Sequence, residues 1–422
     1  MKNLSLKLFI VVVSLLLVGF VLGYGQLDEV YERALDQMEA GQLEQALSLL
    51  EDVIDERPDF AEAWNNKGAI HLVTGNYPEA ERCLEEALRI KPEYPKAQAN
   101  LGSVYLKQGK TEKAIIAFKD ALEIDPSNEE ANYNLGNVYF QRGQLEKARN
   151  HLEIVVENNS DHYKAFYRLG QVSARTGQEE KARQYFEKAL NSEDEDPEVL
   201  NGVGRFYLQT GEFVRAERYL SKAHKLADKK PGPLHNLGLV YLKRGEYSRA
   251  IDYFKNALRY YSEKNVRGLS QLHSDYGLAL YRTRSYKEAL KQFQKALKLN
   301  NYNASAHFNL GLLFEKTGNY ERALDHYEFA FNIDDQYVNA YNNYGLLLMN
   351  VRENYEEALK YFERAIDVDS GYVFAYYNRG IALINLERYA EARQSLQRVI
   401  EVVSPEKKLY KRARDLLDEL EG

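Results

Sequence analysis

The chain of 422 residues carries 56 Lys and Arg against 63 Asp and Glu, which gives a formal net charge of −7. Proteins that wrap nucleic acid usually carry a basic excess, because phosphate neutralisation dominates such binding, so this balance argues against nucleic acid as a partner. The single cysteine, Cys83, excludes an internal disulfide framework and a multi-cysteine metal site, and it is expected to be a small, semi-buried apolar residue.

The N-terminal segment, residues 1–26, is predicted to be a hydrophobic membrane anchor or a signal peptide. Lys2 and Lys7 precede an apolar run from Leu8 to Leu22. With the glycines that follow, this run is just long enough to cross a bilayer core of ~30 Å as a helix. A run of this length also suits a cleaved secretory signal, so both alternatives stand.

The charges on either side of this segment predict its orientation. Lysines precede it and Asp28, Glu29 and Glu32 follow it. The positive-inside rule therefore leaves the N-terminus in the cytoplasm and places the rest of the chain on the other side of the membrane. We expect the main body on the periplasmic or extracytoplasmic face, either anchored to the membrane or secreted after cleavage.

Residues 27–406 repeat with a period of 34. Two series of small residues mark the period. They comprise Gly68, Gly102, Gly136, Gly170, Gly204, Gly238, Gly277, Gly311, Gly345 and Gly380, and Ala46, Ala80, Ala114, Ala148, Ala182, Ala216, Ala250, Ala289, Ala323, Ala358 and Ala392. Small residues let two helix axes approach to about 8 Å, so each period is predicted to be a helical hairpin. No hairpin buries its apolar face alone, and the hairpins are therefore expected to stack.

One segment, residues 61–94, carries the pattern most completely. It contains Trp64, Gly68, Gly75, Tyr77, Ala80, Leu84, Ala87 and Pro92. This pattern resembles the tetratricopeptide repeat (TPR). The resemblance implies an all-α fold, a right-handed superhelical solenoid of about eleven TPR helical hairpins. Repeats would start near residues 27, 61, 95, 129, 163, 197, 231, 270, 304, 338 and 373, and a C-terminal capping helix would follow over residues 407–422.

Two insertions interrupt the period. About five extra residues fall between Ala257 and Gly277, and one falls near Arg352. The longer insertion is expected either to lengthen a helix or to form a loop.

The repeats leave no room for a separate catalytic domain. The eight histidines are scattered, and no two lie three or four residues apart to share a metal from one helix face. We therefore predict a protein that is not an enzyme, with no catalytic residue, no metal site and no cofactor.

The resemblance implies that the first helix of each hairpin lines the concave face through positions 2, 5, 6, 9, 12 and 13 of the repeat. These positions share one helical face by their spacing. Position 6 holds Asn66, Asn100, Asn134, Asn236, Asn309, Asn343 and Asn378, and Arg168, Gly202 and Asp275 interrupt the row. Each amide offers donors and an acceptor, so an asparagine ladder is predicted to grip the backbone of an extended peptide. The alternative is that these amides only solvate the surface.

In repeats three to nine, position 13 is basic or neutral, although the chain as a whole is acidic. It holds Lys107, Gln141, Arg175, Gln209, Lys243, Arg282 and Lys316. This row favours acidic or carboxylate-bearing ligands. A solvated stripe of charge is the alternative.

Repeats three to five resemble in part a TPR site that clamps a C-terminal carboxylate. Asn134, Lys164 and Arg168 match that site, whereas Ala99 and Ser103 stand where it would have Lys and Asn. The partial match predicts a weaker carboxylate clamp.

These features together predict a protein–protein interaction scaffold that binds extended peptide segments and organises cell-envelope, secretion or assembly complexes. The alternatives are a structural solenoid that self-associates and an adaptor subunit that recruits a separate enzyme.

Overall fold

The computed structural model describes residues 27–191 and 195–421. These ranges consist of helices joined by short turns, with no strand, and the prediction of an all-α solenoid of stacked hairpins is confirmed for them. The predicted anchor or signal peptide, residues 1–26, lies outside the described residues. Within the described ranges, no helix is both long enough and apolar enough to cross a membrane.

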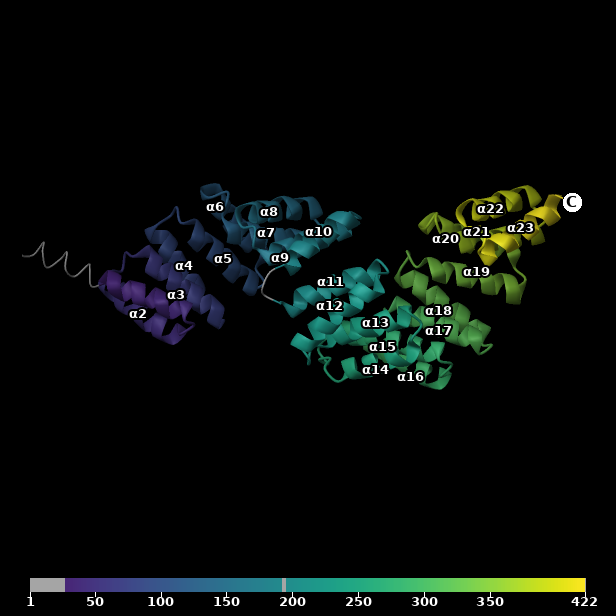
Figure 1. Ribbon diagram of the computed structural model, residues 1–422, viewed down its shortest axis with the longest axis horizontal. Coiled ribbons are helices and arrows are strands. Elements are labelled where there is room, and N and C mark those ends of the chain that lie inside the picture. The colour runs from purple at the N-terminus through teal and green to yellow at the C-terminus, as the bar shows by residue number, and fades with distance from the viewer. Residues whose placement is uncertain (1–26, 192–194, 422) are drawn as a thin grey trace, which may run out of the picture. The chain divides into compact units, whose positions relative to one another are not determined.

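The chain divides into two compact units, which meet in sequence between Glu195 and Asp196. Unit 1 begins with a helix over residues 27–39 and continues with α2 (Leu43–Glu56), α3 (Ala61–Thr74), α4 (Tyr77–Ile90), α5 (Pro95–Lys107), α6 (Thr111–Ile124), α7 (Glu129–Gln141), α8 (Leu145–Asn158), α9 (Tyr163–Arg175) and α10 (Glu179–Leu190). In both units consecutive helices pack in pairs, as Figure 1 shows. We number these pairs as hairpins 1 to 11, so that α3 and α4 form hairpin 2.

Unit 2 holds hairpins 6 to 11 and a final single helix. Its helices are α11 (Pro197–Gln209), α12 (Phe213–Leu226), α13 (Pro231–Lys243), α14 (Tyr247–Leu258), α15 (Val266–Arg282), α16 (Tyr286–Leu299), α17 (Ala304–Lys316), α18 (Tyr320–Ile333), α19 (Val338–Arg352), α20 (Tyr355–Val368), α21 (Val373–Asn385), α22 (Tyr389–Val402) and α23 (Lys408–Glu421). Helix α23 buries Ala413 and Leu417 against Leu396 and Val399 of α22. It therefore covers the apolar face that the last hairpin would otherwise expose, as predicted for a capping helix.

In hairpins 2 to 11, the repeated glycine of the first helix lies directly against a side chain of the second helix. A Cβ atom built on Gly238 would lie 2.4 Å from Cε1 of Phe254, and one on Gly170 would lie 2.5 Å from Cδ1 of Phe186. Both phenylalanines are almost completely buried. Only glycine leaves room for the ring at this point, which explains the period of the glycine series.

The turns between the two helices of a hairpin adopt one backbone conformation. Gly75 has a φ of +82° there. Arg284, Glu353 and Glu387 occupy the same turn in hairpins 8, 10 and 11, with φ values of 63°, 51° and 57°. A residue with a side chain in this left-handed region loses roughly 1 kcal/mol of folding free energy. The three hairpins without glycine therefore keep the same turn geometry but are slightly destabilised by it.

The five-residue insertion in hairpin 8 has both of the expected effects. Helix α15 has 17 residues where α13 has 13, because it starts earlier at Val266. A loop over residues 259–265 joins it to α14. The insertion thus changes the N-terminal end of one first helix and leaves the glycine contact at Gly277 in register.

Hairpin 9 buries a pair of histidines between its two helices. The Nδ1 atoms of His307 and His326 lie 3.0 Å apart, so one ring donates a hydrogen bond to the other. The His326 ring also stacks on Phe314, with ring centres 5.4 Å apart. Burial, with a smaller contribution from the neighbouring His307, lowers the pKa of His326 to about 4.

We expect hairpin 9 to loosen as the pH falls from neutrality. The pKa of His326 is depressed in the folded chain, so the unfolded chain binds more protons between about pH 6.5 and about pH 4. The stabilisation is fully present above this window and is lost through it, by on the order of 1–2 kcal/mol after solvent screening. Hydrogen exchange of α17 and α18 at about pH 7.5 and about pH 5 measures the change. His326→Gln removes the titration, and an equal acid effect in this variant would rule out His326 as the cause.

Candidate peptide-binding surface

The seven predicted asparagines of position 6 all lie on first helices, and all are at least half-buried. Asn66, Asn100, Asn309 and Asn378 are 5–7% exposed, and Asn134, Asn236 and Asn343 are half-buried. They therefore lie in the seam between consecutive first helices and not on an open face.

Most of these amides bridge one hairpin to the preceding one. Their nitrogens donate to side-chain oxygens on the previous first helix, at 2.8 Å for Asn66 to Tyr31, 2.8 Å for Asn100 to Asn65, 3.1 Å for Asn134 to Ser103, 2.9 Å for Asn236 to Asn201, 3.2 Å for Asn309 to Ser274 and 2.8 Å for Asn378 to Asn342. Asn343 instead donates to the hydroxyl of Tyr327 at 3.5 Å. The ladder thus fixes the spacing of first helices, a role that the sequence analysis missed. An amide has a second N–H and a second lone pair, so part of its hydrogen-bonding capacity remains.

The basic residues of position 13 lie about two turns further along the first helices, at their C-terminal ends. Arg175, Lys243, Arg282 and Lys316 are exposed, and each stands in the last turn of its helix. The helix dipole favours a cation at this end of a helix. The basic row therefore has a structural explanation in addition to the predicted role in binding.

Arg168 and Arg175 meet at Phe140 of the preceding first helix. Their guanidinium carbons lie 4.8 Å and 4.9 Å from the centre of the Phe140 ring. Arg168 donates to Oδ1 of Asn137 and to Oε1 of Gln171, both at 2.6 Å, and Arg175 donates to the Phe140 carbonyl oxygen at 3.2 Å. These acceptors are all neutral, so they orient the two cations without compensating their charge.

The rest of the predicted carboxylate clamp differs from the family site. Lys164 is exposed on the first turn of α9, near the ring of Tyr163. Asn134 donates to Ser103, whose hydroxyl donates in turn to Oε1 of Glu130 at 2.8 Å. Burial raises the pKa of this Glu130 carboxyl. The structure therefore places a carboxyl group beside Asn134, which the motif comparison did not anticipate.

Unit 2 contains two cavities along the first helices of hairpins 8 to 10. One of about 450 Å³ is lined by Tyr281, Leu312, Glu315, Lys316, Tyr320, Leu347, Asn350 and Val351. Its wall includes the predicted residue Lys316, but also Glu315, which accepts a hydrogen bond of 2.6 Å from the buried hydroxyl of Tyr327. Apolar side chains and one charge of each sign therefore share this cavity.

The second cavity, of about 670 Å³, lies at the other end of the same helices. It is lined by Asn265, Arg267, Gly268, Gln271, Asn300, Tyr302, Asn303, Ala304, Ser305, Ile333, Asp334 and Tyr337. Three of these residues, Asn265, Arg267 and Gly268, belong to the insertion of hairpin 8. The repeat period reveals the insertion, but it gives no sign that these residues line a cavity.

Comparisons with known proteins concern the fold. Two solved structures resemble the chain along nearly its whole length. A chain of the APC/C hetero-tetramer Cut9–Hcn1 is 14% identical with a TM-score of 0.54, over 93% of this chain and 96% of that one. Yeast Tom70 is 14% identical with a TM-score of 0.50, over 94% and 95%. At this identity the likeness shows the fold alone. No curated protein sequence matches the chain.

Family models match most of the repeats directly. Models described as tetratricopeptide repeat match residues 59–127, 105–172, 163–196, 195–263, 304–337 and 345–404, and a model described as TPR repeat matches residues 277–318. These matches cover consecutive hairpins in both units. The chain belongs to the tetratricopeptide repeat family.

Proposed function

We propose that this protein is an interaction scaffold that holds extended segments of partner proteins against its first helices, with a preference for acidic or carboxylate-bearing segments. The observation that carries the proposal is the pair of guanidinium groups of Arg168 and Arg175 at Phe140. Neutral acceptors hold both in place. Because these cations are already oriented and keep their charge, they lose little freedom on binding a carboxylate.

The asparagines and the unit 2 cavities extend this proposal beyond one contact. An amide such as Asn134 retains an N–H for a peptide carbonyl after its bond to Ser103. In unit 2, Tyr281 and Leu312 give the 450 Å³ cavity an apolar wall beside Lys316. A partner segment would thus place an acidic group against the first helix α9 of unit 1, or an apolar side chain in the cavity along the first helices of unit 2.

A matched pair of peptides tests the proposal. A short acidic peptide with a free C-terminal carboxylate is expected to bind the full chain with micromolar affinity, on the order of −8 kcal/mol. The same peptide with a neutral, amidated end and amide side chains should bind at least about tenfold more weakly, since charge-assisted hydrogen bonds contribute roughly 1.5–3 kcal/mol each. Equal affinity for the two peptides would sink the preference for acidic segments. Large, concentration-dependent species in sedimentation without any peptide would favour self-assembly instead.

We also propose that the hairpins lie outside the cytoplasm, where they organise envelope, secretion or assembly proteins. The support is the sequence of residues 1–32, with lysines before the apolar run and acidic residues after it. A reporter that is active only in the cytoplasm, fused after Gly422, is expected to be inactive, while one that is active only outside should work. The reverse result would overturn this placement and leave the scaffold proposal standing.

A further inference from the structure

Hairpin 2 departs from its neighbours at three related positions. In five other hairpins, an aromatic ring at position 11 of the repeat, on the first helix, lies under a cation at position 19 of the repeat, on the second helix. The pairs are Lys113 at 5.5 Å from Tyr105, Lys147 at 5.5 Å from Tyr139, Arg215 at 5.4 Å from Tyr207, Arg249 at 4.1 Å from Tyr241 and Arg322 at 5.5 Å from Phe314. Hairpin 2 has His71 and Glu79 at these positions, and Cys83 one helical turn after Glu79.

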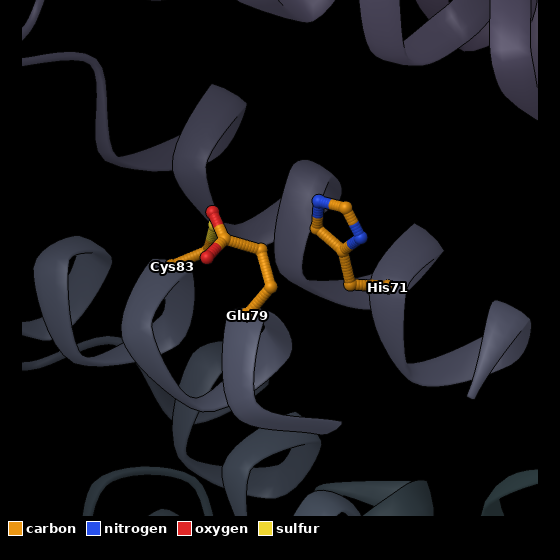
Figure 2. A group of neighbouring side chains, drawn as sticks. All are labelled: His71, Glu79 and Cys83. Atoms are coloured by element: carbon orange, nitrogen blue, oxygen red, sulfur yellow. The ribbon is translucent and has the colours of Figure 1, made fainter. Parts of the chain in front are cut away.

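The side chains of His71, Glu79 and Cys83 lie close together. His71 comes from the last turn of α3, and Glu79 and Cys83 come from the first turns of α4, as Figure 2 shows. One ligand atom from each lies within 4.8 Å of the other two. The Sγ of Cys83 is 3.8 Å from Oε1 of Glu79. Cys83 is buried, and the other two side chains are half-buried.

We propose that His71, Glu79 and Cys83 bind a divalent transition-metal ion, for which Zn²⁺ is the best fit. An imidazole nitrogen, a carboxylate oxygen and a thiolate sulfur are the ligand types that zinc takes, at ~2.0–2.3 Å. In a tetrahedral site, bonds of this length bring the ligand atoms to about 3.5 Å from one another. Side-chain rotations that move these atoms by about 1 Å would therefore be enough to form the site. A three-residue set leaves the fourth position to a water molecule.

Protonation and nearby charges are compatible with this role. Burial lowers the pKa of His71, which keeps the ring neutral and able to donate a lone pair. Burial and the Glu79 carboxylate raise the pKa of the Cys83 thiol to about 11, so the metal ion must displace the thiol proton, which leaves to solvent. The thiolate and the carboxylate then supply two negative charges to the divalent ion.

Two cations near the site are held by carboxylates. Arg82 donates to Oε1 of Glu79 at 2.6 Å and would orient that ligand from behind, while Lys67 is paired with Glu51 at 2.8 Å. Hydrogen bonds of this kind to a ligating carboxylate tune and fix metal sites. Glu79 therefore serves Arg82 and the metal ion at once.

Replacements taken from hairpin 3 provide the test. His71→Tyr and Cys83→Ala introduce the residues that hairpin 3 has at the same positions, Tyr105 and Ala117, so both variants are expected to fold. The full chain, prepared without a polyhistidine tag, should bind one equivalent of Zn²⁺ in a competition titration. Each variant should bind at least about tenfold more weakly, since even outer contacts of a metal site contribute 10–100-fold in affinity. His151→Gln, which changes a half-buried histidine of hairpin 4, is the matched control and should leave the affinity unchanged.

Cobalt gives a second readout that identifies the sulfur ligand. Co²⁺ in place of Zn²⁺ should show a thiolate-to-metal charge-transfer band in the wild type and in His151→Gln, and no such band in Cys83→Ala. The proposal is overturned if the wild type binds no stoichiometric Zn²⁺, if His71→Tyr and Cys83→Ala bind it as tightly as the wild type, or if the charge-transfer band persists without Cys83.

Discussion

Ala148→Glu is expected to unfold hairpin 4 locally and to leave distant hairpins of the chain protected. Ala148 is fully buried on α8, and its carbonyl oxygen would be 3.4 Å from a Cβ atom on Gly136 of α7. A glutamate there overpacks the contact and buries an unpaired charge, which costs roughly 4 kcal/mol. In a stack of repeats each unit contacts mainly its neighbours, so the damage should spread to hairpins 3 and 5 at most.

Hydrogen exchange resolved along the chain measures this effect. We expect faster exchange in hairpins 3 to 5 and unchanged protection in hairpins 8 to 11. Asn150→Glu is the control, because Asn150 is exposed on the same helix and receives the same charge change. Loss of protection in both units in a single step would contradict a stack stabilised hairpin by hairpin.

Arg168→Glu combined with Arg175→Glu is expected to lower the affinity for acidic peptides with a free C-terminus at least about tenfold. The reason is that the double variant loses at least one charge-assisted hydrogen bond to the peptide. Both guanidinium groups flank Phe140 and lack a carboxylate partner among the described residues. Reversal of their charges should also remove most of the salt dependence of binding, because screening acts on the lost attraction. Fluorescence titration at two salt concentrations measures both effects.

A second pair of reversals separates this site from net charge. Lys291→Glu combined with Lys298→Glu changes the net charge equally, on exposed positions of the second helix α16. We expect this control to keep most of the affinity. If both double variants lose affinity equally, binding depends on overall charge and not on the cations at Phe140.

The hairpin architecture follows from the sequence because its main contacts are local and recur with one period. Gly170 and Ala182 lie twelve residues apart, on two helices joined by one turn, so the pattern itself encodes the contact. The ring of Phe186, four residues after Ala182, fills the space that Gly170 leaves. Local pairing of this kind makes helix positions predictable without knowledge of distant contacts.

The candidate site was less predictable, because its geometry depends on contacts between hairpins. The repeat period places Asn100 in the predicted peptide-binding row, yet its amide nitrogen donates to Asn65 of the previous first helix. The period identifies the row but not the partner of each amide. The division into two units at Glu195 is also invisible in the glycine series, since Gly170 and Gly204 keep the spacing of 34 residues across it.

The metal ligands proposed in hairpin 2 illustrate the same limit. His71 and Glu79 are eight residues apart and lie on different helices, so no single-helix spacing connects them. Their proximity comes from the hairpin turn at Gly75. Comparison of equivalent positions between hairpins was the signal that could have found them.

Site-specific photo-cross-linking tests the central claim that partner segments bind along the first helices. A cross-linking residue at Gln141, exposed at the end of the first helix α7, is compared with one at Asn150, exposed on the second helix α8. An acidic peptide with a free C-terminus should be captured from Gln141 in a saturable way and displaced by unlabelled peptide, with little capture from Asn150. Capture that is equal at the two positions, or stronger from Asn150, would contradict binding along the first helices.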